Sequence, residues 1–211
     1  MVSTITMMMF RKYVILFTVA AAVALADQWS KFVVVRELTT LMNRSSSLTA
    51  QLEAMYSSFP PEGLDGNHLH GKRMIVLSPH FFRIRYAENP GAAWGLFRNL
   101  PESIRGPLFH VVSLGAVFLI IYYFRKLSGL DPAEKWALWG LPLVLGGAVG
   151  NYIDRLARGF VVDFLEAHWY DRAAWPVFNL ADSAICIGIG LLVLDAFVRR
   201  EKKDSPATVG S

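Results

Sequence analysis

The sequence predicts an all-α membrane protein: a four-transmembrane-helix bundle with a small extracytoplasmic β-structure. The 211-residue chain has a mean hydropathy of +0.36, and 18% of it is charged, against about a quarter in soluble domains. Its apolar residues gather in four long stretches, none alternating with the period of two expected of a membrane barrel. Basic residues flank these stretches and form no stripe with interleaved aromatics, which argues against nucleic-acid binding.

Each apolar stretch is long enough to cross a bilayer, which takes roughly 20 helical residues. The predicted order begins with a cytoplasmic N-terminus and first helix over residues 1–36. Three further helices follow, over residues 107–124, 136–155 and 181–198. An alternative for the first stretch is a cleavable signal peptide, since Arg11 and Lys12 precede it and Ala24-Leu25-Ala26 resembles a cleavage site. Hydrophobicity resumes at residues 32–35, which favours a membrane helix.

The distribution of Lys and Arg predicts the orientation. Basic residues precede the first helix, occupy the short segment 125–135 and follow the fourth helix. With four helices these segments share one side, so we expect both termini, the 125–135 loop and the 199–211 tail in the cytoplasm. Segments 37–106 and 156–180 are then extracytoplasmic.

The segment 37–106 divides into two parts. Residues 38–73 are polar and read as a flexible insertion, tolerated at the surface or binding a partner, with a short helix near Leu48–Tyr56. Residues 74–98 should form the β-structure and a lid, with strands at Met74–Leu77 and Phe81–Tyr86 joined by a turn at Ser78-Pro79.

Ionisable residues near the hydrocarbon are functional candidates, because burying them is costly. Asp27 and Lys31 are four residues apart in the first helix, on one face with Ala20 and Ala24. They are either a structural ion pair or part of a substrate site. In the third helix Gly147, Asn151 and Arg155 share a face beside Asp154, forming either a peptide-binding surface or a polar helix end.

Asp163 and Asp182 are the candidate catalytic pair. Asp163 stands alone among apolar residues, and Asp182 follows nineteen residues later at the start of the fourth helix, at the same membrane level. Two carboxyl groups meeting in a low-dielectric site would share one proton, giving a general acid and a general base. The alternative for Asp182 is a helix N-cap.

No other catalytic pattern competes. The chain has no H-E-x-x-H, no G-x-S-x-G and no phosphate-binding glycine loop. Ser30 and Lys31 suggest a Ser–Lys hydrolase, but adjacent residues of a helix point apart and make a poor pair of nucleophile and base. The one cysteine, Cys186, excludes an internal disulfide and a multi-cysteine metal site.

Five motifs taken together resemble lipoprotein signal peptidase, also called signal peptidase II. In chain order they are Asp27-Gln28-Trp29-Ser30-Lys31, residues 89–95 (NPGAAWG), residues 146–155 (GGAVGNYIDR), Val161-Val162-Asp163-Phe164 and Phe178-Asn179-Leu180-Ala181-Asp182. The resemblance covers almost the whole chain apart from residues 38–73, which most members of this family lack, and the C-terminal tail.

The resemblance implies an aspartic endopeptidase of the bacterial inner membrane that cleaves diacylglyceryl-modified prolipoproteins before the lipidated cysteine. It implies Asp163 and Asp182 as the catalytic dyad, the inhibitor globomycin as a ligand, and no cofactor or metal. We expect a monomer, since one chain supplies both carboxylates. It also implies substrate-binding or supporting roles for Asp27, Lys31, Asn89, Gly91, Ala92, Gly147, Asn151, Asp154, Arg155, Asn179 and Ala181.

Two other functions are compatible with several polar residues in membrane helices. An aspartyl protease related to presenilin would carry G-x-G-D, which is absent. A small transporter would use Asp154, Asp163 and Asp182 as a path near the membrane midplane, although four helices are few for transport and no inverted repeat is visible.

Overall fold

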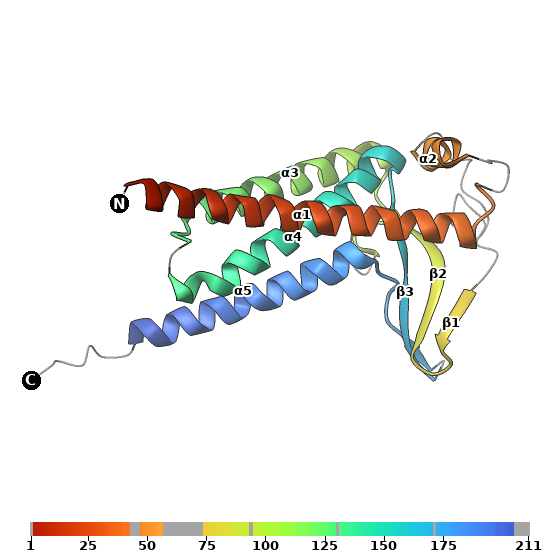
Figure 1. Ribbon diagram of the computed structural model, residues 1–211. Coiled ribbons are helices and arrows are strands. Elements are labelled where there is room, and N and C mark those ends of the chain that lie inside the picture. Colours follow the sequence, from red (N-terminus) through yellow and green to blue (C-terminus); the bar gives the residue numbers. More distant parts are fainter. Residues whose placement is uncertain are drawn as a thin grey trace, which may run out of the picture.

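The computed structural model describes residues 2–42, 47–56, 74–92, 95–129, 131–170 and 172–204. Four long helices lie side by side and an antiparallel sheet covers one end of the bundle (Figure 1), here called the sheet end. The helices are α1 (Val2–Leu38), α3 (Glu102–Lys126), α4 (Lys135–Arg158) and α5 (Leu180–Asp204). Each contains a stretch long and apolar enough to cross a membrane, so the predicted fold class is confirmed.

The helices extend beyond the apolar stretches that predicted them. Helix α3 begins at Glu102, directly after Pro101, so Pro107 lies inside the helix and not at its start. Helix α4 continues to Arg158, where Gly159 ends it in the left-handed conformation with φ 77°. Helix α5 runs to Asp204, into the segment expected to be a tail. Polar residues form these extra turns, which hydropathy alone does not detect.

Helix α4 packs against α1, α3 and α5. Small residues allow the close approach, as is usual between membrane helices. At Gly146 an added Cβ would lie 2.7 Å from the carbonyl oxygen of Ala20, so only glycine fits there without displacing α1. Ala20 and Ala24 are both buried, which confirms the predicted inner face of the first helix.

The sheet has strand order β1-β2-β3-β4, and its strands pair antiparallel. The hairpin of β1 (Met74–Ser78) and β2 (Phe82–Asn89) was predicted. Strands β3 (Val161–Trp169) and β4 (Ala173–Ala174) were not, although they come from the predicted 156–180 segment. In the β2–β3 register Ala87 lies opposite Asp163, so the candidate carboxylate belongs to the part of β3 that pairs with the end of β2.

The insertion contains the predicted helix, α2 (Leu48–Tyr56). Its Met55 is fully buried in an apolar cluster with Phe32 of α1 and Val162 of β3. The expectation of a flexible insertion falls mainly on residues 43–46 and 57–73, which lie outside the described residues. Helix α2 itself packs against the sheet end.

Candidate active site

The start of α5 holds Asp182 through a reciprocal pair of hydrogen bonds. The side-chain oxygen of Asn179 accepts the Asp182 N–H at 2.9 Å, and the Asp182 carboxylate accepts the Asn179 N–H at 3.2 Å. This is the capping-box arrangement, with Asn179 as N-cap and Asp182 at the third helical position. The N-cap alternative for Asp182 is therefore wrong by three residues: Asn179 caps the helix.

Asp163 is a nearly buried carboxylate on β3, with 3% of its surface exposed. Asn179 Nδ2 donates to one of its oxygens at 2.7 Å, and Asn89 Nδ2 donates to the other at 3.1 Å. Burial and the negative charge of Asp182 raise the pKa of Asp163 to about 7, although both amide donors oppose the shift. Asp163 is therefore able to hold or release a proton near neutral pH.

Asn151 connects the two carboxylates to the rest of the site. Its Nδ2 donates to Asp182 at 2.8 Å. Its Oδ1 accepts from Asn179 Nδ2 and from Lys31 Nζ, both at 3.1 Å. Among the described residues, every hydrogen bond donated to Asp163 and Asp182 comes from a side-chain amide or a backbone N–H.

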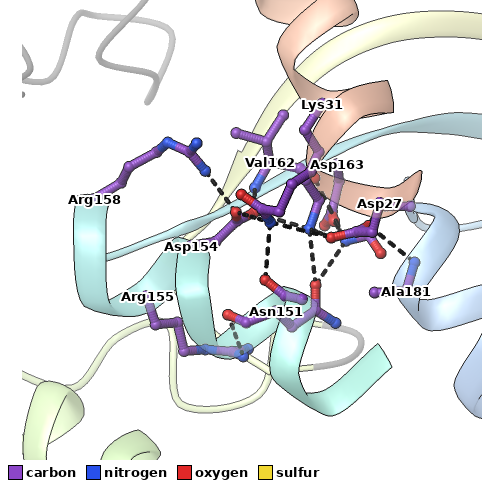
Figure 2. A network of polar contacts seen from close by, with 12 residues as sticks. Asp27, Lys31, Asn151, Asp154, Arg155, Arg158, Val162, Asp163 and Ala181 are labelled. Atoms are coloured by element: carbon purple, nitrogen blue, oxygen red, sulfur yellow. Dashed lines mark hydrogen bonds and ion pairs between the residues drawn. The ribbon is translucent and has the colours of Figure 1, made fainter. Parts of the chain in front are cut away.

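A second group of charged residues lies close to Asp163, and Figure 2 shows both. Lys31 Nζ lies 2.7 Å from Asp27 and 2.9 Å from Asp154, and the three side chains are fully buried. Arg158 donates to Asp154 at 2.5 Å. We call Asp27, Lys31, Asp154 and Arg158 the ion network. It confirms the predicted Asp27–Lys31 pair.

The ion network also fixes backbone on either side of the candidate dyad. Asp27 accepts the N–H of Ala181 at 3.0 Å, and Asp154 accepts the N–H of Val162 at 3.0 Å. Ala181 and Val162 are the chain neighbours of Asp182 and Asp163. Asp27 therefore fixes the backbone next to Asp182, and Asp154 fixes the backbone next to Asp163.

The segment after β2 lies against the candidate pair. The side-chain oxygen of Asn89 accepts the N–H of Gly91 at 3.0 Å, and Arg155 donates to the carbonyl of Gly91 at 3.1 Å. An added Cβ at Gly91 would lie 2.6 Å from the carbonyl oxygen of Leu96, so glycine allows the close approach. Ala92 donates its N–H to that same oxygen at 2.8 Å.

Gly95 is favoured as glycine by its backbone conformation and not by a close contact. It has open space around its Cβ position, and its φ of 72° is the left-handed conformation that glycine adopts freely. Ala93 and Trp94, in the middle of the predicted lid, lie outside the described residues.

Gly147 brings α4 against the start of α5. An added Cβ there would lie 2.4 Å from the carbonyl oxygen of Ala181. With this contact, the structure brings together at the sheet end every residue that the sequence singled out: Asp27, Lys31, Asn89, Gly91, Ala92, Gly147, Asn151, Asp154, Arg155, Asp163, Asn179, Ala181 and Asp182.

Arg158 and Gln28 also contact the site, and neither was predicted from the sequence as a site residue. Arg158 lies one helical turn after Asp154, an opposite-charge spacing that the sequence does display. Gln28 donates to Asp154 at 2.8 Å. It is adjacent to Asp27 in sequence, but nothing in its own pattern indicates this long-range contact.

Comparisons with known proteins agree with this geometry. The family model for signal peptidase (SPase) II matches residues 19–198. A lipoprotein signal peptidase of Anaeromyxobacter sp. (strain Fw109-5) is 43% identical over 192 residues, covering 88% of this chain and 85% of the relative. One from Geobacter metallireducens is 43% identical over 133 residues, covering 62% and 78%.

The fold also occurs in solved structures. A bacterial membrane enzyme structure determined by the in meso method at 2.3 Å resolution has a TM-score of 0.62 and 23% sequence identity, covering 92% of this chain and 94% of its own. At that identity the likeness concerns the fold alone. The family model covers most of the chain, and on that evidence the chain belongs to the signal peptidase II family.

Proposed function

We propose that the chain is an aspartic endopeptidase that removes the signal peptide from diacylglyceryl-modified prolipoproteins, cleaving before the lipid-modified cysteine. The observation that carries the proposal is a pair of carboxylates at one end of a membrane bundle that, within the described part of the chain, accept hydrogen bonds from side-chain amides and backbone N–H groups. Relatives named lipoprotein signal peptidase supply the reaction class.

The two carboxylates divide the acid–base work. Asp163 is the more buried and has a pKa raised to about 7, so it holds the shared proton. Asp182 accepts a proton from a water molecule, whose oxygen attacks the scissile carbonyl carbon. Asp163 donates its proton to the carbonyl oxygen. When the tetrahedral intermediate collapses, the C–N bond breaks and Asp182 gives the proton that it took from water to the leaving nitrogen. A hydroxyl group of the intermediate returns a proton to Asp163, which restores the starting state of the pair.

The position of the pair suits a lipidated substrate. Asp182 lies in the first turn of α5 and Asp163 lies on the sheet, so the scissile bond is met at the end of the membrane span. Water reaches this level while the acyl chains remain in lipid. In our account the sheet end is extracytoplasmic, both termini are cytoplasmic, and the membrane is the bacterial inner membrane.

Neighbouring residues hold the peptide. Asn151 and Arg155 carry N–H donors suited to peptide carbonyls. Residues 89–95 act as a lid over the substrate, and Arg155 tethers the lid through the carbonyl of Gly91. If cross-linking this segment to the membrane surface left turnover unchanged, the lid would have no role in catalysis. The same surface is proposed to bind globomycin, and the enzyme to act as a monomer.

The transporter alternative is disfavoured by the placement of the carboxylates. Asp154 lies in the last turns of α4, Asp163 on the sheet and Asp182 in the first turn of α5, all at the sheet end of the bundle. A transport path requires such groups near the midplane of the membrane.

The test is cleavage of a purified diacylglyceryl-modified prolipoprotein by the purified chain in detergent micelles. Mass spectrometry of the products should locate the new N-terminus at the lipidated cysteine, and the unmodified precursor should be cut far more slowly. Binding of the substrate without any cleavage, by a folded wild-type protein, would contradict the proposed function.

A further inference from the structure

Helix α2 belongs to the insertion, yet two of its residues contact the polar side chains behind the candidate dyad. Figure 1 shows α2 at the sheet end of the bundle. Met55 is fully buried, and the neighbouring Tyr56 is 39% exposed. Met55 therefore anchors the end of α2 in the apolar cluster, and Tyr56 lies beside it, partly exposed.

The first contact is with Arg158 of the ion network. Arg158 Nε donates to the backbone carbonyl of Met55 at 3.0 Å, and the guanidinium lies 4.8 Å from the centre of the Tyr56 ring. The Arg158 side chain is fully buried, and a buried guanidinium needs acceptors for its donors. Helix α2 supplies one acceptor and an aromatic face.

The second contact is with Gln28 of α1. The Tyr56 hydroxyl donates to the side-chain oxygen of Gln28 at 2.9 Å. Gln28 Nε2 in turn donates to Oδ1 of Asp154 at 2.8 Å, the same oxygen that accepts from Arg158. Helix α2 therefore holds both side chains that donate to this oxygen.

The other oxygen of Asp154 contacts residues next to the candidate dyad. Oδ2 lies 2.9 Å from Lys31 Nζ and accepts the N–H of Val162 at 3.0 Å. Val162 directly precedes Asp163 in β3. A continuous path of contacts therefore joins Tyr56, through Arg158 and Asp154, to the backbone that carries a candidate catalytic carboxylate.

We propose that α2 is a positioning element for the dyad, with Tyr56 as its positioning residue. By fixing Arg158 and Gln28 on one oxygen of Asp154, it orients the other oxygen towards Val162 and so sets the position of Asp163. Tyr56 does not touch the substrate. The inference rests on the proposed function for its readout, and it gives part of the insertion a role other than that of a tolerated surface loop.

The test compares variants of the full chain in single-turnover cleavage, with enzyme in saturating excess over the lipidated substrate. The rate constant then reports on active molecules and is insensitive to any misfolded fraction. Tyr56→Leu removes the ring and the hydroxyl, and it should lower the rate constant about tenfold. Tyr56→Phe keeps the ring over Arg158 and should stay within about threefold of wild type.

The matched control is Leu48→Ala, an exposed position of the same helix. It should leave the rate constant unchanged, and the enzyme concentration that gives half the maximal rate should not move in any of the three variants. In an Arg158→Lys background, Tyr56→Leu should cause a much smaller further loss, because both changes break the same path.

The outcomes separate this inference from the proposed function. If wild type cleaves while Tyr56→Leu matches Leu48→Ala, the positioning role is wrong and the proposed function stands. An equal loss from Tyr56→Leu with and without Arg158→Lys would also overturn it. If Arg158→Lys fails to fold, the Tyr56 series alone decides. If folded wild type cuts nothing, the proposed function itself fails.

Discussion

Two pairs of carboxylates meet at the sheet end, and they differ in what holds them. Asp27 and Asp154 are fully buried and share the cation of Lys31, with Arg158 also on Asp154. Asp163 and Asp182 receive hydrogen bonds from asparagine amides and backbone N–H groups.

This difference distinguishes a structural ion network from a candidate catalytic pair. A nearby cation favours the ionised carboxylate, whereas amides give hydrogen bonds without cancelling its charge. In the proposed mechanism, two carboxylates that are held by amides and lie close together keep one proton between them, which is what an acid–base pair needs. The cation-held pair fixes backbone next to each member of the amide-held pair.

The largest expected effect is on the amide-held pair. Asp163→Asn and Asp182→Asn should each lower cleavage by about 10³–10⁴-fold, because each removes one proton-transfer group. Turnover of the lipidated prolipoprotein should be measured beside binding of the same substrate, which both variants should retain. Asp195→Asn alters a buried carboxylate outside the site, paired with Arg199, and it should remain active. Near-normal turnover in either dyad variant would contradict the assignment.

Loss of the network cation should act on stability. Lys31→Met leaves Asp27 and Asp154 buried without their shared partner, and it should cost about 3–5 kcal/mol of the free energy of unfolding. Thermal unfolding in detergent measures the change. The control is Arg36→Ala, which breaks the half-exposed Arg36–Glu37 pair and should change stability by about 0.5 kcal/mol or less. Equal effects would mean that the network is not a structural support.

At Gly147, helix α4 packs closely against the start of α5, which carries Asp182. Replacing Gly147 tests this contact. Gly147→Ala places a Cβ against the Ala181 carbonyl, and it should destabilise the protein by about 1–3 kcal/mol and reduce cleavage by displacing the start of α5. Gly115→Ala in α3 has open space around the added Cβ, so it should be neutral or slightly stabilising. Matching melting temperatures for the two variants would refute the close contact.

The dependence of stability on pH tests the buried state of Asp163 in the amide-held pair. The folded-state pKa of Asp163 is raised from 3.8 to about 7, so the folded state binds this proton more tightly than the unfolded state. The contribution of Asp163 to stability therefore falls as pH rises from about 4 to 7. Asp163→Asn removes this dependence, so its free energy of unfolding relative to wild type should rise between pH 4 and pH 8, by up to about 4 kcal/mol for a pKa that is raised from 3.8 to about 7. Thermal unfolding of both proteins across this pH range measures the change. A difference independent of pH would show that Asp163 is not perturbed.

Local sequence spacing predicted much of this arrangement. Four apolar stretches indicated the bundle, the four-residue spacing of Asp27 and Lys31 indicated their ion pair, and isolation among apolar residues indicated Asp163. The shared face of Gly147, Asn151 and Arg155 indicated part of the polar surroundings. The resemblance to a known family then supplied Asn89, Gly91 and Asn179.

The remaining features depend on contacts between distant segments. Strand β3 was missed because residues 161–164 are all buried, which hides the alternation that identifies a strand. The alternative that Asp182 is an N-cap arose because sequence places a cap only to within a turn, and Asn179 caps the helix. The docking of Tyr56 on Arg158 and Gln28 joins three segments and has no local signal.

The most direct test of the amide-held pair as a proton-sharing dyad is a carbon-13 NMR titration of the Asp163 carboxyl group, in wild type and in Asp182→Asn. Our account predicts a pKa near 7 in wild type, because burial and the charge of Asp182 both raise it. Asp182→Asn removes that charge, so the pKa of Asp163 should fall. A wild-type Asp163 that titrates near 4, or a pKa that Asp182→Asn leaves unmoved, would contradict the shared proton and with it the proposed mechanism.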